Sequence, residues 1–68
     1  MNLRRSLAKN VRNWRTRNGM SQEAFADLVG LHRTYVSQIE CEKRAPTIDV
    51  IQQMAEAMKL SACDLLGE

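Results

Sequence analysis

The chain has 68 residues, which is enough for one domain and too few for two, so residues 1–68 are expected to form a single domain. Its 44% hydrophobic and 26% charged residues are ordinary proportions for a soluble globular protein. The sequence contains neither the roughly 20 apolar residues of a membrane span nor the apolar run of about 7–15 residues found in a signal peptide. We therefore expect a cytoplasmic protein without a membrane partner.

Apolar periodicity and turn residues predict helices along the first half of the chain. A first helix is expected over residues 3–18, where apolar side chains recur at steps of four, four and three, with Gly19 as its stop. A second helix is expected over residues 21–29, from Ser21 as its N-cap to Gly30 just beyond its end. The apolar stripe of the first helix consists of Leu3, Leu7, Val11 and Trp14.

Three further helices are predicted in the remainder of the chain. The third covers about residues 32–40, and the fourth covers residues 47–58, beginning at an N-cap threonine directly after the only proline. The fifth covers residues 61–66, where Ser61 and Asp64 match a capping box. Five short helices joined by connections of two to six residues predict an all-α fold, a compact helical bundle.

Residues 22–41 have the features of two helices joined by a tight turn, a helix-turn-helix. Ala26 is small where the two helices must approach each other, and Gly30 supplies the backbone conformation that the turn needs. Val36 and Ile39 would anchor the third helix to the core. The other side of that helix carries hydrogen-bonding polar groups, and a helix with such side chains fits the major groove of B-DNA. These outward-facing residues are Arg33, Thr34, Ser37 and Gln38.

Charge is distributed unevenly along the chain, although the net charge is only +2. Residues 1–17 carry six basic groups and no acid, whereas residues 45–68 carry one basic group and four acids. This asymmetry is consistent with a basic face turned toward a polyanion, and equally with a solvated helix surface.

The sequence does not contain the residue sets that a catalytic site or a metal site would need. Cys41 and Cys63 are isolated cysteines and His32 is the only histidine, so no zinc-ligand set is present. The chain also lacks a nucleophile–base pair and a pair of catalytic carboxylates. We therefore expect a protein that is not an enzyme and that uses no metal and no cofactor.

Taken together, these features resemble a known family, the phage-repressor/Cro-type helix-turn-helix proteins, also called the xenobiotic-response-element (XRE) family. The resemblance extends over about residues 7–67, in the family's order and spacing. It implies a five-helix, lambda-repressor-like DNA-binding domain that regulates transcription as a homodimer on a pseudo-palindromic, double-stranded DNA operator. The matching residues include Arg15, the run Gly19-Met20-Ser21-Gln22-Glu23, Ala26, Leu28-Val29-Gly30, the run Tyr35-Val36-Ser37-Gln38-Ile39-Glu40 and the run Lys43-Arg44-Ala45-Pro46-Thr47.

The resemblance also implies roles for individual residues. Arg15 and Glu40 would form an internal ion pair that ties the first helix to the end of the third. Gln22 would bond a phosphate and brace the third helix, which is the recognition helix; its alternative is a simple first residue of the second helix. Tyr35 would contact the DNA backbone or flanking bases, with a purely structural role as its alternative. The residues implied to contact bases are Arg33, Thr34, Ser37 and Gln38. Those implied to contact the DNA backbone are Gln22, His32, Tyr35, Lys43 and Arg44. The homodimer would form through Leu60, Leu65 and Leu66. Closing of the core is the alternative for all three, and it is the favoured one for Leu65 taken alone.

Two positions depart from the family pattern. Glu42 stands where the family usually has a glycine shortly after the recognition helix, so a strained or altered turn is expected there. Cys41 stands where the family often has a basic or polar residue, and an inert thiol is favoured over a redox-sensitive one.

Residues 31–37 also resemble the recognition helix of restriction–modification controller proteins, which are small dimeric regulators of their own operons. Because no segment is left outside the helical domain, no small-molecule effector is expected. An antitoxin-type regulator that also binds a partner protein is the alternative, and it is disfavoured because the chain has no spare segment for wrapping a partner.

Overall fold

The computed structural model describes residues 2–67, and all of its regular elements are helices. They pack into a body of about 29 × 24 × 22 Å with a radius of gyration of 10.4 Å. The predicted all-α, five-helix fold is thus confirmed, with ends that differ from the expected ones by a residue or so. The helices are α1 (Leu3–Arg17), α2 (Gln22–Val29), α3 (Arg33–Glu40), α4 (Ile48–Met58) and α5 (Ala62–Leu66).

Side-chain caps begin each helix. The N-caps Ser21 and Thr47 accept hydrogen bonds from backbone N–H groups three residues on, as the sequence predicts. Ser61 opens α5 in a complete capping box with the side chain three residues later. Asn2 caps α1, and His32 proves to be the N-cap of α3 rather than its first residue. Each cap satisfies an N–H group that the first turn of a helix leaves without a partner.

A residue in the left-handed backbone conformation follows the end of four of these helices. Gly19 and Gly30 have φ angles of 67° and 77°, as expected of glycines that follow a helix. Glu42 and Lys59 adopt the same conformation at 62° and 59° although both carry a Cβ atom. The left-handed region is unfavourable for residues with a Cβ, so the ends of α3 and α4 hold strained residues.

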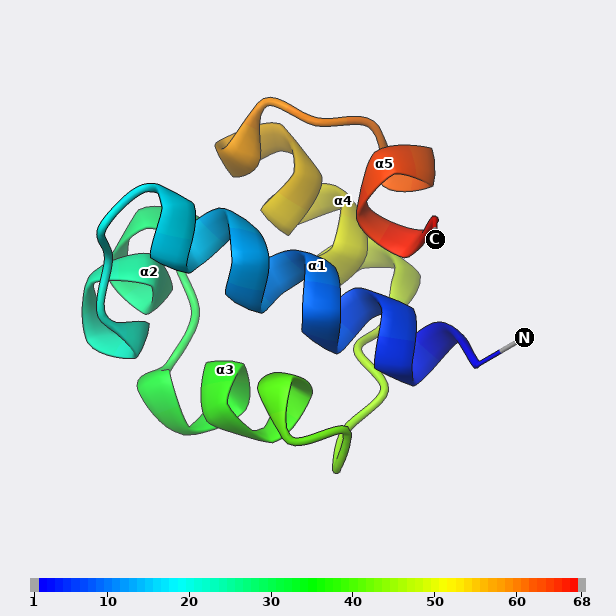
Figure 1. Cartoon of the computed structure of the whole chain (residues 1–68), viewed down its shortest axis with the longest axis horizontal. Helices are drawn as coiled ribbons and strands as arrows, with labels where there is room; N and C mark the ends of the chain where they lie inside the picture. Colours follow the sequence, from blue (N-terminus) through cyan, green and yellow to red (C-terminus); the bar gives the residue numbers. More distant parts are fainter. Residues whose placement is uncertain (1, 68) are drawn as a thin grey trace.

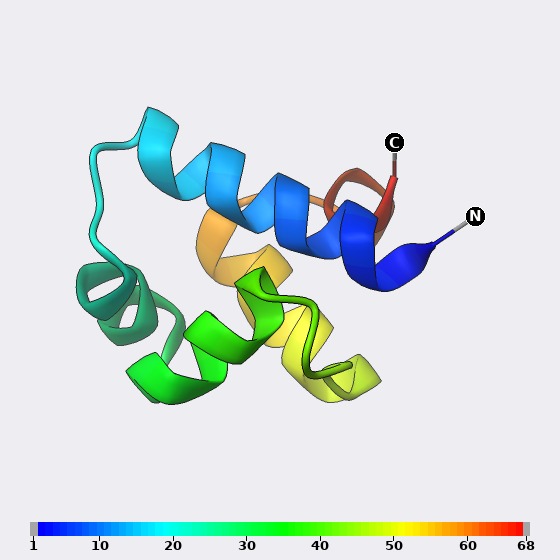
Figure 2. The ribbon, with the colours of Figure 1, turned by 60° about the horizontal axis from the view of Figure 1, so that its bottom comes forward.

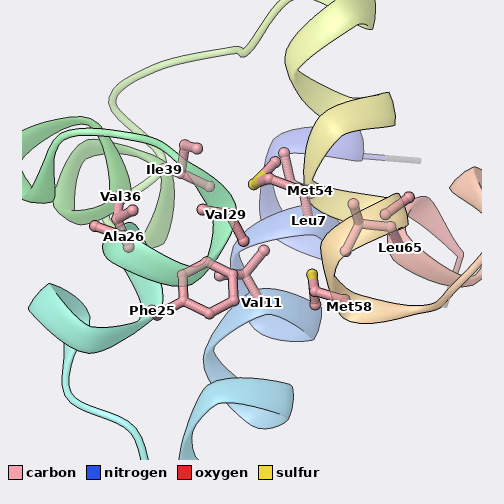
Figure 3. Close-up of a cluster of buried hydrophobic side chains, with 11 residues drawn as sticks. Leu7, Val11, Phe25, Ala26, Val29, Val36, Ile39, Met54, Met58 and Leu65 are labelled. Carbon is pink, nitrogen blue, oxygen red and sulfur yellow. The ribbon is translucent and has the colours of Figure 1, made fainter.

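The hydrophobic core lies where α1, α2, α3 and α4 meet, and α5 closes it (Figure 3). Ala26, Val36 and Ile39, which the sequence predicts to face inward, are confirmed as buried, and Phe25 of α2 is fully enclosed. Trp14 is half-buried and meets the Phe25 ring edge-on, with 5.8 Å between ring centroids. Leu3 was expected on the apolar stripe of the first helix but is 52% exposed, and Ile48 is 82% exposed. Each is the first residue of its helix and lies beyond the reach of the core.

Helix α1 crosses the middle of the molecule, with α3 on one side of it and α5 on another (Figure 1). After a 60° rotation α3 still lies at the periphery of the bundle (Figure 2). The Asn10 side chain fixes α5 to α1, since its Nδ2 lies 2.7 Å from the carbonyl oxygens of both Leu65 and Gly67. Within residues 2–67, none of the helices combines the length and apolar character needed to cross a bilayer.

Candidate nucleic-acid interface

The turn between α2 and α3 sets the outward position of α3. Ala26 is 2% exposed at the contact between the two helices, and its carbonyl oxygen accepts the backbone N–H of Leu31 at 2.9 Å. Gln53 of α4 donates to the carbonyl oxygen of Val29 at 2.6 Å, which satisfies the end of α2. A Cβ atom at Gly30 would lie 3.0 Å from Gln53 Nε2, so space as well as the left-handed backbone favours glycine there.

The outward face of α3 brings together the four residues predicted to contact bases. Arg33 and Thr34 are exposed, while Ser37 and Gln38 are half-buried. Their spacing of one, three and one residues places them along one side of a helix. The opposite side is anchored by Val36 and Ile39, which are 0% and 1% exposed. Because the buried anchors fix the rotation of α3, the polar side chains are held pointing away from the core.

The carboxylate of Glu40, at the end of α3, is the most deeply buried charge in the part of the chain that the structure describes, with a residue exposure of 3%. Arg15 of α1 approaches it in a bidentate pair, with Nε 2.7 Å from Oε2 and Nη2 3.0 Å from Oε1. The hydrogen bond to Glu40 raises the pKa of the Arg15 guanidinium, while its partial burial acts in the opposite direction. Arg15 Nη1 also donates to the carbonyl oxygen of Met20 at 2.8 Å.

Two further side chains complete this cluster. Gln22, the first residue of α2, donates from Nε2 to Glu40 Oε1 at 3.2 Å. Arg12 donates from Nη2 to the backbone carbonyl oxygen of Glu40 at 2.8 Å, and its Nε lies 3.7 Å from Glu40 Oε1. Residues from α1 and α2 thus converge on the last residue of α3, which holds the outward helix at a fixed angle to the bundle.

Arg12 is the member of this cluster that the sequence analysis did not single out. It precedes Arg15 by three residues, so the two guanidinium groups share one face of α1. That spacing is the signal that could have identified it. Together, Arg12 and Arg15 show that part of the basic N-terminal segment is directed inward toward Glu40 rather than toward a polyanion.

The start of α3 presents an imidazole. His32 Nδ1 accepts the backbone N–H of Thr34 at 3.1 Å, and the residue is otherwise exposed. In a neutral ring whose Nδ1 is an acceptor, the proton resides on Nε2. The N-cap therefore offers an outward N–H donor beside the first turn of α3, where a helix N-terminus favours anions.

The segment after α3 folds back along the helix in a Schellman motif. The backbone N–H of Lys43 donates to the carbonyl oxygen of Gln38 at 2.9 Å, and that of Glu42 to the carbonyl oxygen of Ile39 at 3.1 Å. Glu42 occupies the position that glycine normally takes, at a φ of 62°. The turn that was expected to be strained or altered keeps the glycine-type geometry and is strained. Its carboxylate lies 3.9 Å from Arg5 Nε in an exposed pair.

The two basic residues of this loop differ in their surroundings. Lys43 is exposed. Arg44 is also exposed, but its Nε donates to Gln38 Oε1 at 2.6 Å and its guanidinium carbon lies 4.7 Å from the centroid of the Tyr35 ring. The half-buried Tyr35 ring packs against the core on its inner side. Tyr35 therefore has a structural contact and also supports Arg44.

One of the three expected dimer residues is wrongly assigned. Leu65 is 0% exposed and lies within the core, so its side chain has no surface to offer a second subunit. Leu60 and Leu66 are half-buried and border an open apolar groove of about 370 Å³ between α4 and α5. The exposed Ile48 lies at the same groove. Its other lining residues are Ile51, Gln52, Ala55, Glu56 and Ala62.

Within residues 2–67, no three side chains among the histidines, cysteines and carboxylates are arranged to hold a metal ion. Cys41, the C-cap of α3, and Cys63 of α5 are free and exposed thiols. The outward face of α3 offers hydrogen-bonding side chains and, at Arg33, a positive charge.

Comparison with known families places most of the chain in one group. Residues 11–65 match the family described as Helix-turn-helix (HTH_3), and this range includes α2, the turn, α3 and α4 entire. A relative, the control protein C.SmaI of Serratia marcescens, is 39% identical over 66 residues, covering 97% of this chain and 79% of the relative.

Two solved structures have the same fold. A hypothetical transcription factor, NHTF from Neisseria, superposes with a TM-score of 0.90 at 41% identity, over 97% of this chain and 76% of that one. The restriction-modification controller protein C.AhdI from Aeromonas hydrophila superposes with a TM-score of 0.83 at 32% identity, over 91% of this chain and 94% of that one. The five-helix arrangement and the placement of the turn are thus those of solved relatives.

Proposed function

The chain belongs to the helix-turn-helix family of DNA-binding transcription regulators, and we propose that it acts as a homodimer on a pseudo-palindromic operator. The observation that carries the proposal is the outward face of α3. Arg33 and Thr34 are exposed there, while a network of three side chains around Glu40 fixes the helix from behind. Such a helix fits the B-DNA major groove with its polar side chains toward the base edges.

The residues around α3 supply contacts of two kinds. Arg33 offers a guanidinium fork suited to guanine, Thr34 a methyl group suited to thymine, and Ser37 a hydroxyl group. His32 Nε2 and the Lys43 ammonium flank the helix, and we assign them to phosphates, which position the protein without reading sequence. Gln22 gives its amide donor to Glu40, so we assign it chiefly to bracing the helix.

The second subunit is proposed to sit on the groove between α4 and α5. A domain of this size buries only about 60% of the surface that its unfolded chain exposes, so covering an apolar groove adds needed stability. Ile48, at 82% exposure, and the half-buried Leu60 and Leu66 place three large apolar side chains around that groove. A two-fold axis there would set two copies of α3 into successive major grooves about 34 Å apart.

Within the family, we propose the role of a restriction–modification controller that regulates its own operon. The support is the local sequence of residues 31–37 together with two relatives of that description: C.SmaI is a control protein and C.AhdI a restriction-modification controller protein. Occupancy of an operator near a promoter would block or recruit polymerase.

Selection of bound sequences from a random duplex pool tests this proposal, followed by titration of the selected duplex at two salt concentrations. We expect a pseudo-palindrome whose affinity falls steeply as salt rises, because phosphate contacts release counterions. Failure to enrich any motif would contradict the operator-binding role. Finding the selected motif beside a restriction–modification operon of the source genome would support the controller role, and its absence there would count against it.

The dimer is tested by matched substitutions on two exposed apolar side chains. Ile48→Asp places a charge at the groove, whereas Leu28→Asp places one on α2, at a side chain that is 44% exposed and does not line it. We expect Ile48→Asp to sediment as a monomer and to bind the operator poorly, while Leu28→Asp stays dimeric. A dimeric Ile48→Asp variant would move the interface elsewhere.

A further inference from the structure

The side chain of the loop residue Arg44 folds back onto α3 and contacts two of its residues. Its Nε donates to Gln38 Oε1 at 2.6 Å, and its guanidinium carbon lies 4.7 Å from the centroid of the Tyr35 ring. Hydrogen bonds in which one partner is charged are short and strong, and a guanidinium group stacks favourably on an aromatic face. Two contacts of different kinds, one polar and one stacking, thus hold the group in place.

The backbone around Arg44 is also restrained. The N–H of Lys43, the preceding residue, donates to the carbonyl oxygen of Gln38 at 2.9 Å, which closes the turn around Glu42. Tyr35 packs on the core from its half-buried position, so the platform beneath Arg44 does not depend on the loop. Arg44 is therefore held at the outward face of α3 before any ligand binds.

Donor chemistry then determines which way the Gln38 amide faces. A guanidinium group carries donors only, so the amide must turn its oxygen toward Arg44 and its nitrogen away from it. Among the described residues, Gln38 Nε2 has no hydrogen-bond partner, and no buried side-chain nitrogen or oxygen is left without one, so this nitrogen is open to solvent. Without Arg44 the amide would be free to flip and offer its oxygen instead.

We propose that Arg44 is a positioning residue for base recognition, which orients Gln38 so that its amide nitrogen faces the major groove as a donor. This inference rests on the proposed function and deepens it. A donor at this position matches purine N7, guanine O6 and thymine O4, and it does not match cytosine, whose major-groove group is itself a donor. Gln38 is thereby a selective reader, and Arg44 acts on sequence preference rather than as a simple phosphate clamp.

The experiment measures base preference as well as affinity. Each base pair of the selected operator half-site is replaced in turn by the other three, and binding is measured for the wild type and for Gln38→Ala. The pair at which Gln38→Ala loses discrimination is the pair that Gln38 reads. At that pair we expect the wild type to disfavour cytosine by about fivefold or more on the strand that Gln38 faces.

Arg44→Ala is then compared with Lys43→Ala, which removes an exposed cation from the same loop. Arg44→Ala should reduce preference at the Gln38 pair to the level of Gln38→Ala, and the double variant should lose no further preference there. Lys43→Ala should weaken binding to all sequences by one common factor. Arg44→Lys, which keeps the charge but lacks the planar group that stacks on Tyr35, should recover affinity more than preference.

Gln38→Glu provides a gain-of-preference test. One carboxylate oxygen would pair with Arg44 and the other would face the groove as an acceptor, where the glutamine presents a donor. Preference at the same pair should therefore shift toward cytosine N4 or adenine N6, which are donors. If Arg44→Ala lowers affinity for every duplex equally and leaves all base preferences intact, the positioning role is overturned while the proposed function stands. A wild type with no base preference at any position would overturn both.

Discussion

The left-handed backbone conformation of Glu42 predicts that replacing this residue with glycine stabilises the fold. Glu42 has a φ of 62° at the position of the Schellman motif that glycine normally occupies. In this region the Cβ atom crowds the following carbonyl oxygen, at a cost of about 1–2 kcal/mol for a residue other than glycine. Glu42→Gly removes that clash without changing a buried side chain, because Glu42 is exposed.

The expected gain is smaller than the strain itself. Glycine loses more backbone freedom on folding, which offsets about 0.5–1 kcal/mol of the gain. The substitution also removes the ion pair with Arg5, but at 3.9 Å between two exposed side chains this pair contributes little. Glu42→Gly should therefore raise the free energy of unfolding by about 0.5–1 kcal/mol, which corresponds to a rise in Tm of roughly 2–8 °C for a domain of this size.

Thermal unfolding followed by circular dichroism measures the change, at one fixed protein concentration because the proposed dimerisation would make Tm depend on concentration. Glu42→Ala is the matched control, since it removes the carboxylate and keeps the Cβ atom. We expect no gain in Glu42→Ala. Equal gains in both variants would assign the effect to charge, and an unchanged or lower Tm in Glu42→Gly would refute the reasoning from backbone strain.

Three further predictions concern the ion pair at Glu40, the core and the outward face of α3. Glu40→Gln leaves Arg15 facing a neutral group and should lower the free energy of unfolding by about 3–5 kcal/mol in urea titrations, whereas the same change at the exposed Glu23 should have little effect. Leu65→Ala should cost about 2–5 kcal/mol in the same assay, and a change near zero would contradict its place in the core. Arg33→Ala should weaken operator binding by about 1–3 kcal/mol and relax specificity at one base pair, and equal weakening on specific and random duplexes would argue for a phosphate contact instead.

Several features of the fold are predictable from local spacing alone. The stops at Gly19 and Gly30, the caps at Ser21 and Thr47 and the capping box at Ser61 all depend on residues within one helical turn of each other. These helix ends can be predicted because a short segment can supply hydrogen-bond partners for its own terminal N–H and C=O groups. The same is true of the buried face of α3, which follows from a period of 3.6 residues.

The outward face of α3 is only partly predictable from local spacing. The polarity of Arg33 and Thr34 and their side of the helix follow from the spacing along α3. The hydrogen bond between Arg44 and Gln38 does not, because it joins residues six apart across a left-handed turn whose geometry at Glu42 no propensity predicts. Arg44, which the family resemblance assigns to the DNA backbone, is held against α3 by this hydrogen bond.

The amino-acid sequence by itself thus determined the five helices, their limits to within about a residue, the side of α3 that faces outward and the family to which the chain is similar. The tertiary structure alone decided that Leu65 belongs to the core, that Arg12 joins the cluster at Glu40 and that Arg44 is bonded to Gln38. The physical reason is range. Helix formation and capping are satisfied among near neighbours, whereas burial and side-chain pairing depend on how closely segments from different helices approach one another.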